Sequence, residues 1–478
     1  MRYLPAKALL VAFLALTFGC SSFPSLPGRT PHAWELAPAP AQDRPVVDAA
    51  RLHRRTLDNG LTVIVLEDRR LPRLDMGVRV RRGAAIVPAS EAGLADFTAE
   101  LMGRGAGTRT ALELASVVDA LGASLGVSAS WDTLSAGVGG LSRDRDVLFE
   151  VLADVVLRPR FDSDEVDRVR AEQLAALEKA RESPETLAAW NFAAALNPGH
   201  PYQWPTSGRP ETVARLGAQQ ARAFHQRVFV PANAIFFAVG DLDPEALLAR
   251  VEEAYGGWAS GPVPEPGPEP PDRTGRDIVV VDRPDLGQAQ IIIGHPGITR
   301  QEPRRIPIQV MNTVLGSAGF SSRLMSKIRA EEGLTYGVYS QFAGRRLRGP
   351  FAVGTFTRVP EVGRVVELTL AELTRIRNEP PSAEELAAAK SLLVGRFALG
   401  LETSAAVLSG LVELDVQGLP ADSLDTYRGR IRALIPEQTA AAAHDFVRPD
   451  DALIVVVGPA EALVPQLETF GPVRVVQP

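Results

Sequence analysis

The sequence predicts an α+β protein made of two homologous halves, each with a mostly antiparallel sheet covered by helices, in a clamshell-like arrangement. The first observation behind this prediction is an internal repeat, because residues 228–258 and 445–471 share one pattern. Each segment combines a turn, a β-rich run, a glycine and an amphipathic helix. The matched positions keep one offset: Pro231 with Pro449, Ala234 with Ala452, and Gly240 with Gly458.

A proline-rich stretch between the two halves is the second observation. The run GPVPEPGPEPPD, within residues 261–275, holds six prolines and offers little to bury, which is typical of a semi-rigid polyproline linker. It separates an N-terminal domain, 48–260, from a C-terminal domain, 276–478. The third observation is that segments with a strand-like spacing of apolar residues alternate with segments of helix-like spacing in both domains.

Local patterns justify each element of the first half. Residues 57–68 are predicted as a strand entered through an Asn59-Gly60 turn, and residues 75–85 alternate apolar and polar side chains. The elements that follow are helices near 91–103 and 110–121, strand-like residues 124–141, and helices near 143–156 and 164–182.

The second half repeats this order. Its predicted elements are strands near 277–282 and 288–294, helices near 305–316 and 320–331, strands near 335–343 and 350–357, and helices near 360–377 and 382–400. The last of these helices has a clear start, because Ser382 can cap it and Glu385 stands at the capping-box position.

Composition excludes several classes of protein. A formal net charge of −6 and a pI near 5.7 argue against a nucleic-acid binder. Past the N-terminus there is no apolar run long enough to span a membrane. With a single cysteine, the chain has neither an internal disulfide nor a multi-cysteine zinc site.

The N-terminus is predicted to direct export. Residues 1–20 combine basic residues, a short apolar run and a final Gly-Cys, a pattern that resembles a bacterial lipoprotein signal. That resemblance implies lipidation of Cys20, and Ser21 after it fits the outer membrane. Residues 21–47 then form a flexible tether rich in Ser, Pro and Ala. The alternative is a plain secretory signal with a chance cysteine. The expected location is periplasmic.

Two motifs carry a family resemblance over roughly residues 50–475. GLADFTAELMGRGAGT occupies 93–108, and GSAGFSSRLMSKIRAEEGLTYGVYS occupies 316–340. Their order resembles the pitrilysin/insulinase peptidases, including bacterial members similar to mitochondrial processing peptidase. That family holds zinc with H-x-x-E-H on a helix, where side chains four residues apart share one face, and a distant Glu completes the ligands.

The metal residues of that family are missing from this chain. Asp96 and Glu100 stand where the two histidines would be, Ala99 replaces the catalytic Glu, and Ala176 occupies the place of the third ligand. No two of the six histidines lie four residues apart, so no helical histidine pair exists. We therefore expect no metal and no other cofactor in this chain.

The second motif keeps the family's Arg/Tyr pair, here Arg329 and Tyr336. The resemblance implies that the pair binds the substrate backbone and helps to polarise its carbonyl, a role that suits guanidinium and phenol donors. The alternative is structural: Arg329 would stabilise the C-terminus of a helix, and Tyr336 would be a half-buried strand residue. Gly316 and Gly319 are expected to serve a turn.

The combined pattern predicts a non-zinc-binding subunit of an exported heterodimeric metalloendopeptidase. A partner of similar size with H-x-x-E-H would supply the zinc, and peptides would be the substrate. A different class of function remains open, in which the chain is an inert envelope protein for binding or assembly. A homodimeric hydrolase using other residues is disfavoured, because the lone cysteine of the chain lies in the signal region.

Overall fold

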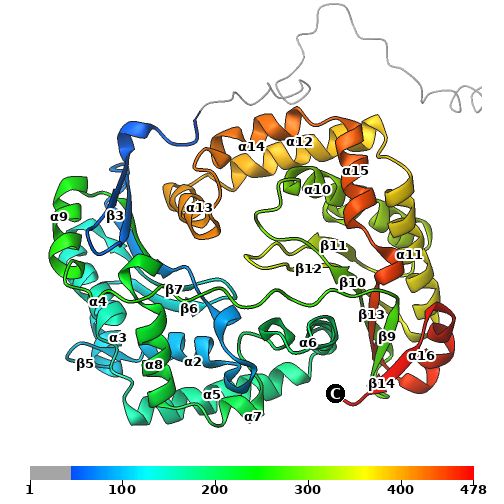
Figure 1. Ribbon diagram of the computed structural model, residues 1–478, viewed down its shortest axis with the longest axis horizontal. Helices are drawn as coiled ribbons and strands as arrows, with labels where there is room; N and C mark the ends of the chain where they lie inside the picture. Colours follow the sequence, from blue (N-terminus) through cyan, green and yellow to red (C-terminus); the bar gives the residue numbers. More distant parts are fainter. Residues whose placement is uncertain (1–44) are drawn as a thin grey trace, which may run out of the picture. The chain divides into compact units, whose positions relative to one another are not determined.

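Two six-stranded sheets with matching strand order organise residues 45–478, the part of the chain that this computed structural model describes (Figure 1). The first sheet has the order β1-β2-β8-β3-β7-β6, and the second, taken from its C-terminal edge, has the order β14-β9-β13-β10-β12-β11. The strands of the first sheet are β1 (Leu52–Thr56), β2 (Thr62–Glu67), β3 (Arg73–Val80), β6 (Ser124–Ala129), β7 (Leu134–Leu141) and β8 (Ala234–Gly240). Those of the second are β9 (Asp277–Asp282), β10 (Gln288–Pro296), β11 (Val338–Phe342), β12 (Pro350–Arg358), β13 (Leu453–Gly458) and β14 (Val473–Val476). The predicted signal peptide, Cys20 and nearly all of the tether lie outside the described residues.

Strand directions confirm the duplication. β2 pairs with β8 in parallel, as β9 pairs with β13. β3 and β10 are then antiparallel to both of their neighbours. Pro231 and Pro449 each begin a short 3-10 turn before β8 and β13. The halves differ at one edge, where β1 is antiparallel to β2 but β14 is parallel to β9. The predicted α+β class with mostly antiparallel sheets is confirmed.

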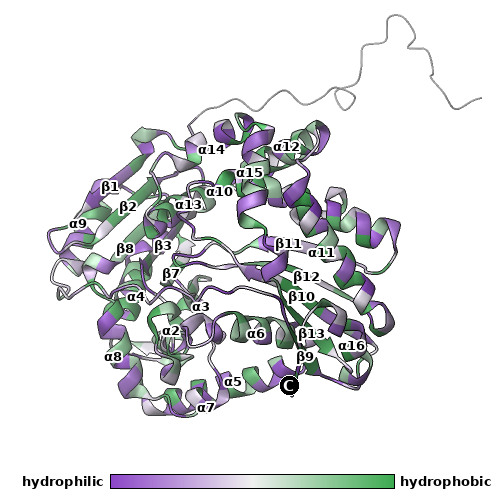
Figure 2. Ribbon diagram, turned by 45° about the vertical axis from the view of Figure 1, so that its right-hand side comes forward, coloured by the Kyte–Doolittle hydropathy of each residue, from purple (hydrophilic) through white to green (hydrophobic). Residues whose placement is uncertain are grey.

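Helices cover one face of each sheet and form two apolar cores. In Figure 2 the central strands are largely hydrophobic, and the covering helices carry hydrophilic residues on their outer sides. The longer helices of the first half are α2 (Leu94–Met102), α3 (Ala111–Ala120), α4 (Arg145–Leu157), α5 (Ser163–Arg181), α8 (Ala218–Val228) and α9 (Pro244–Tyr255). Those of the second half are α10 (Arg305–Asn312), α11 (Val362–Asn378), α12 (Ala383–Leu399), α14 (Ser423–Arg432), α15 (Pro436–Phe446) and α16 (Ala460–Leu467).

The two halves exchange one helix each, and this exchange covers the remaining sheet faces. Helix α6 (Pro184–Leu196) of the first half packs on β13 and β10 of the second, with Leu187 and Phe192 buried. Helix α13 (Ser404–Gln417) of the second half packs on β8 and β2 of the first, with Leu408 and Val412 buried. The sequence pattern left the partners of these apolar faces open, and the structure pairs them within the chain.

Two hairpin tips also join the halves. The Asp132 carboxylate, in the β6–β7 turn, accepts hydrogen bonds from the backbone N–H of Arg346 (3.0 Å) and the side-chain amide of Gln417 (3.3 Å). Beside it, the Arg345 guanidinium lies 5.0 Å from the ring centre of Trp131 and 4.5 Å from that of Tyr202. These contacts place an arginine-rich turn of the second half against aromatic rings of the first.

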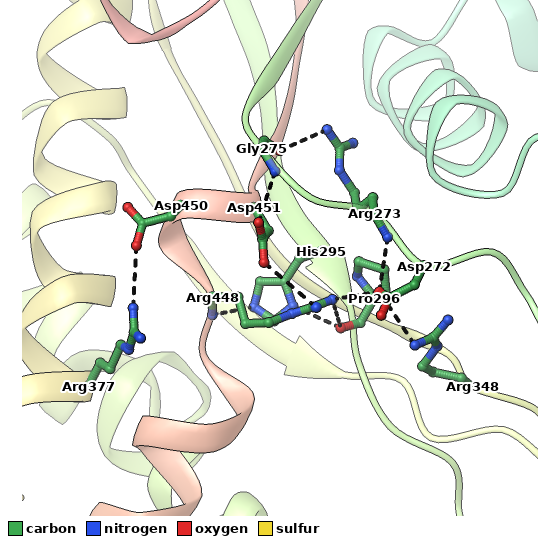
Figure 3. Close-up of polar contacts among 10 residues, drawn as sticks. All are labelled: Asp272, Arg273, Gly275, His295, Pro296, Arg348, Arg377, Arg448, Asp450 and Asp451. Atoms are coloured by element: carbon green, nitrogen blue, oxygen red, sulfur yellow. Dashed lines mark hydrogen bonds and ion pairs between the residues drawn. The ribbon is translucent and has the colours of Figure 1, made fainter.

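The proline-rich linker is anchored at its end to the second half (Figure 3). The Asp272 carboxylate lies between Arg348 (3.5 Å) and Arg448 (3.1 Å). The backbone N–H of Gly275 donates to Asp451 over 2.9 Å. The linker is therefore held by side chains from two separate segments of the second domain.

Two predicted helices differ in detail from the sequence interpretation. Helix α10 ends at Asn312 and continues as a π-helical turn, Thr313–Ser317. The helix expected at 320–331 is a 3-10 turn followed by a π-helical segment, Met325–Glu331. Such π turns insert an extra residue and are frequent at functional sites.

Among residues 45–478, no single helix is long and apolar enough to cross a membrane. Helices α12 and α13 reach that length and hydropathy only as a pair, which is bent by 111°.

Candidate functional site

The positions of the missing zinc motif lie on helix α2. Ala99 is buried, Asp96 is half-buried and Glu100 is exposed. Burial raises the pKa of Asp96 to about 6, and the nearby charge of Glu100 adds to that rise. Within residues 45–478, neither carboxylate has a hydrogen bond or ion pair. The two acids therefore share a helix face, as their spacing predicted, without a cationic partner.

The position of the family's third zinc ligand provides no further metal-binding side chain beside Asp96 and Glu100. Ala176 is exposed on α5. One turn earlier, Glu172 pairs with Arg104 at 2.8 Å, and the Gln173 amide donates to the backbone oxygen of Ser207 at 2.7 Å. No three His, Cys, Asp or Glu side chains of the described residues are placed to hold a metal ion. The residues present do not fit the family's zinc.

The buried histidines are held by backbone groups. In His295, Nε2 accepts from the Arg448 N–H (3.0 Å) and Nδ1–H donates to the Pro296 oxygen (2.9 Å), as Figure 3 shows. Burial lowers the pKa of His295, and that of His225, to about 4. His200 accepts from the backbone N–H of Tyr202 at 3.0 Å. These histidines serve the fold.

Arg329 and Tyr336 lie together at the end of the π-helical segment and just before β11. The Arg329 guanidinium lies 4.8 Å from the ring centre of Tyr336 and 4.4 Å from that of Phe320. Both rings are largely exposed, 76% for Tyr336 and 73% for Phe320. Within residues 45–478, no carboxylate pairs with Arg329. The sequence placed Arg329 near Tyr336 correctly, but a half-buried strand position for Tyr336 is wrong.

Phe320 is the site residue that sequence reasoning missed. It stands in the glycine-rich loop of the motif, and the aromatic residue directly after Gly319 was the available signal. Gly319 has a φ of +66°, which L side chains rarely adopt. A Cβ on Gly316 would lie 2.4 Å from the Ser340 hydroxyl oxygen. Gly319 therefore serves a turn, as expected, whereas Gly316 lies in the π-helical turn and allows close packing against Ser340.

A partly buried ion pair explains the arginine of the Ser-Ser-Arg-Leu part of the motif. Arg323 donates twice to Glu385, over 2.6 and 2.8 Å. This pairing lowers the pKa of Glu385 to about 2. Glu385 also completes the capping box with Ser382 at the start of α12, as predicted. Arg323 therefore ties the glycine-rich loop to α12.

Family models match most of the chain. Residues 62–208 match the model described as insulinase (peptidase family M16), and residues 215–393 match the one described as peptidase M16 inactive domain. The chain belongs to the insulinase family, peptidase M16. The resemblance inferred from the two motifs is thereby confirmed, and the missing zinc motif makes this chain an inactive-type M16 homologue.

Similar proteins cover nearly the same span as this M16 homologue. An uncharacterized zinc protease of Streptomyces coelicolor is 26% identical over 85% of this chain and 90% of its own length. A non-peptidase homolog, YmxG, of Helicobacter pylori is 25% identical over 84% of this chain and 91% of its own length. A crystal structure of a peptidase M16 inactive domain from Pseudomonas fluorescens superposes with a TM-score of 0.80, at 26% identity, over 85% of this chain and 98% of that chain.

The site in this M16 homologue offers hydrogen-bond donors but, among residues 45–478, no set of metal ligands. The Arg329 guanidinium and the Tyr336 hydroxyl are solvent-accessible hydrogen-bond donors held by one short segment. Such donors can hold a peptide backbone and stabilise charge on a carbonyl oxygen. The α2 face offers the Asp96 and Glu100 carboxylates in place of the two histidines of the zinc motif.

Proposed function

We propose that this chain is the non-zinc-binding subunit of an exported, heterodimeric insulinase-type metalloendopeptidase. One observation carries the proposal: residues 45–478 hold no metal ligand set but keep an exposed Arg329–Tyr336 pair. If the chain acted alone, Arg329 and Tyr336 would have no peptide carbonyl held at a zinc ion to polarise. The pair becomes useful when another chain, with H-x-x-E-H, brings zinc and activated water to the same peptide.

The geometry of Arg329 supports a substrate-binding role. Phe320 and Tyr336 lie near its guanidinium, and aromatic contacts of this kind restrict the orientation of the cation. Because no carboxylate of residues 45–478 neutralises it, its charge remains available to a ligand. Arg329 and Tyr336 would contribute peptide binding and carbonyl polarisation at the partner's zinc.

Export and anchoring belong to the same proposal. The signal-like residues 1–20 and the Ser-Pro-Ala tether suggest a periplasmic protein attached by a lipid on Cys20 to the outer membrane. The first segment and nearly all of the second lie outside the residues that the structure describes. The lipid on Cys20 is tested by treating the native cells with globomycin. The mass of the chain in the envelope then shows whether the compound blocks processing of its signal peptide.

Affinity purification of the tagged chain from its native envelope, with mass spectrometry, tests the partner. We expect a chain of similar size with H-x-x-E-H in near-equal amount, and zinc in the complex but not in this chain alone. With that complex in hand, Arg329→Ala should lower kcat at least about tenfold with zinc content unchanged. Arg358→Ala is the matched control, since Arg358 is exposed and pairs only with Glu361. Unchanged peptidase activity in Arg329→Ala would reject the catalytic contribution.

A second candidate function is an inert envelope protein for binding or assembly with a peptidase-like fold. The name of the Helicobacter pylori relative, a non-peptidase homolog, favours it. Under this alternative the chain would purify alone or with envelope proteins that lack H-x-x-E-H. Arg329 and Tyr336 would then be packing residues or relics.

A further inference from the structure

A cavity of about 360 Å³ lies in the second half, away from Arg329 and Tyr336. It opens to solvent and is lined by residues of α10, α13, the end of β11, the end of α12 and the start of α14. Apolar side chains form much of its wall: Ile298, Ile306, Ile308, Phe342, Phe397 and Leu424. A cavity of this size and lining suits a small organic ligand.

Two arginines line this cavity without a counter-ion. Within residues 45–478, neither Arg300 nor Arg305 forms an ion pair, and Arg430 is close enough to repel Arg305. Burial lowers the pKa of Arg305, and the charges of Arg300 and Arg430 add to that effect. The neighbouring Arg304 is the contrast, because it pairs with two carboxylates outside the cavity. Converging cations without an acid are costly in an empty site and favourable for a bound anion.

Hydrogen bonds to backbone oxygens hold the segment that carries Arg300 in place. The N–H of Arg300 donates to the Arg345 oxygen over 2.6 Å, and the Gln301 amide donates to the Gln417 oxygen over 2.7 Å. The anchored turn reduces the ordering that a ligand would have to impose.

A tyrosine gives the cavity a polar wall next to these cations. Tyr427 stacks on Phe397, with 4.6 Å between ring centres, and its hydroxyl donates to Gln309 over 3.0 Å. Arg300 and Arg305 both act electrostatically on that hydroxyl. The charged groups and the aromatic wall therefore face one space.

We propose that this cavity binds a small carboxylate carried on an apolar body, with Arg300 and Arg305 holding the carboxylate. Guanidinium groups match the two oxygens of a carboxylate, and the apolar wall accepts the rest of the ligand. A fatty acid and the free C-terminal end of a short apolar peptide share this chemistry. The site is independent of the Arg329–Tyr336 pair and of any zinc partner.

Isothermal titration of the full chain with two matched probe pairs tests this site. Octanoate is compared with octan-1-ol, and acetyl-Leu-Leu acid with acetyl-Leu-Leu amide. We expect at least one acid to bind, and its neutral counterpart to bind at least about tenfold more weakly. Whichever acid binds more tightly shows whether the natural ligand is a fatty acid or the C-terminal end of an apolar peptide. Inorganic phosphate, which has no apolar body, should bind more weakly than that acid.

Arg305→Met should weaken binding of that acid at least about tenfold, because the substitution keeps the apolar stem and removes the charge. Arg304→Met is the matched control and should leave binding within about twofold. If Arg305→Met does not fold, Arg300→Met takes its place, since Arg300 is exposed and its backbone contacts survive. Equal binding of acids and neutral probes, undiminished binding in the cavity variant, or no binding of either acid would overturn the proposal.

Discussion

At the scale of single residues, the α2 face shows what remains when metal ligands are lost. Asp96 and Glu100 keep the spacing of a ligand pair, but within residues 45–478 neither pairs with a Lys, Arg or His side chain. In a zinc site the metal charge would favour both ionised carboxylates. Here burial and mutual repulsion act instead, so ionisation of Asp96 works against the fold.

Asp96→Asn should therefore stabilise the protein above pH 6 and leave it unchanged near pH 4. The unfolded chain releases this proton near the usual pKa of about 3.9, while the folded chain holds it to about 6. Between these values the folded state binds more protons, so its stability falls as pH rises. Partial exposure of Asp96 reduces the gain in the variant to about 1–2 kcal/mol at pH 8.

Urea titrations at pH 4 and pH 8 measure this difference. Asp119→Asn is the control, because Asp119 is exposed on the neighbouring helix α3 and should show no such pH-dependent gain. An equal stabilisation of Asp96→Asn at both pH values would show that folding does not raise the pKa of Asp96.

At the scale of elements, the exchange of α6 and α13 is the feature that joins the halves. Leu408 is only 2% exposed and packs between α13 and the first sheet. Leu408→Ala should lower the free energy of unfolding by about 2–5 kcal/mol, since it removes buried methyl groups and leaves a cavity. Chemical denaturation of the full chain measures this loss.

Leu399→Ala is the control for that substitution. Leu399 ends α12 and is 74% exposed, so its truncation should change stability by no more than about 0.5 kcal/mol. Similar losses in the two variants would mean that α13 does not depend on the first sheet for its burial.

The sequence could predict elements whose patterns are local. β9 spans 277–282 as expected, and the capping box at Ser382 and Glu385 is present. Helices α6 and α13 were not predicted as elements or as an exchange, because local periodicity does not name a partner that lies in the other half. At the site, the motif located Arg329 and Tyr336. Phe320 has no periodic signal, and its role depends on three-dimensional proximity to Arg329.

At the scale of the whole described chain, three kinds of contact tie the halves into one unit. Exchanged helices bury apolar sheet faces, and hairpin tips meet at Asp132. Asp415 of α13 also pairs with Arg54 and Arg81 of the first half. Because each half covers a sheet of the other, unfolding of one half exposes apolar surface on both.

The two halves should therefore unfold together, and the distribution of tryptophan makes this measurable. All the tryptophans of residues 45–478 lie in the first half: Trp131, Trp190, Trp204 and Trp258. Their fluorescence reports on that half and, through Trp131 beside Arg345 and Trp190 on α6, on its contact with the second half. Far-UV circular dichroism reports on the helices of both. Denaturation curves from the two probes should coincide. Leu408→Ala, a second-half substitution, should lower the tryptophan midpoint and the dichroism midpoint equally. The opposing result is a tryptophan fluorescence midpoint in Leu408→Ala that stays unchanged while the dichroism curve separates into two transitions. That result would mean that the halves are stable independently. The exchanged helices would then be a contact between autonomous domains.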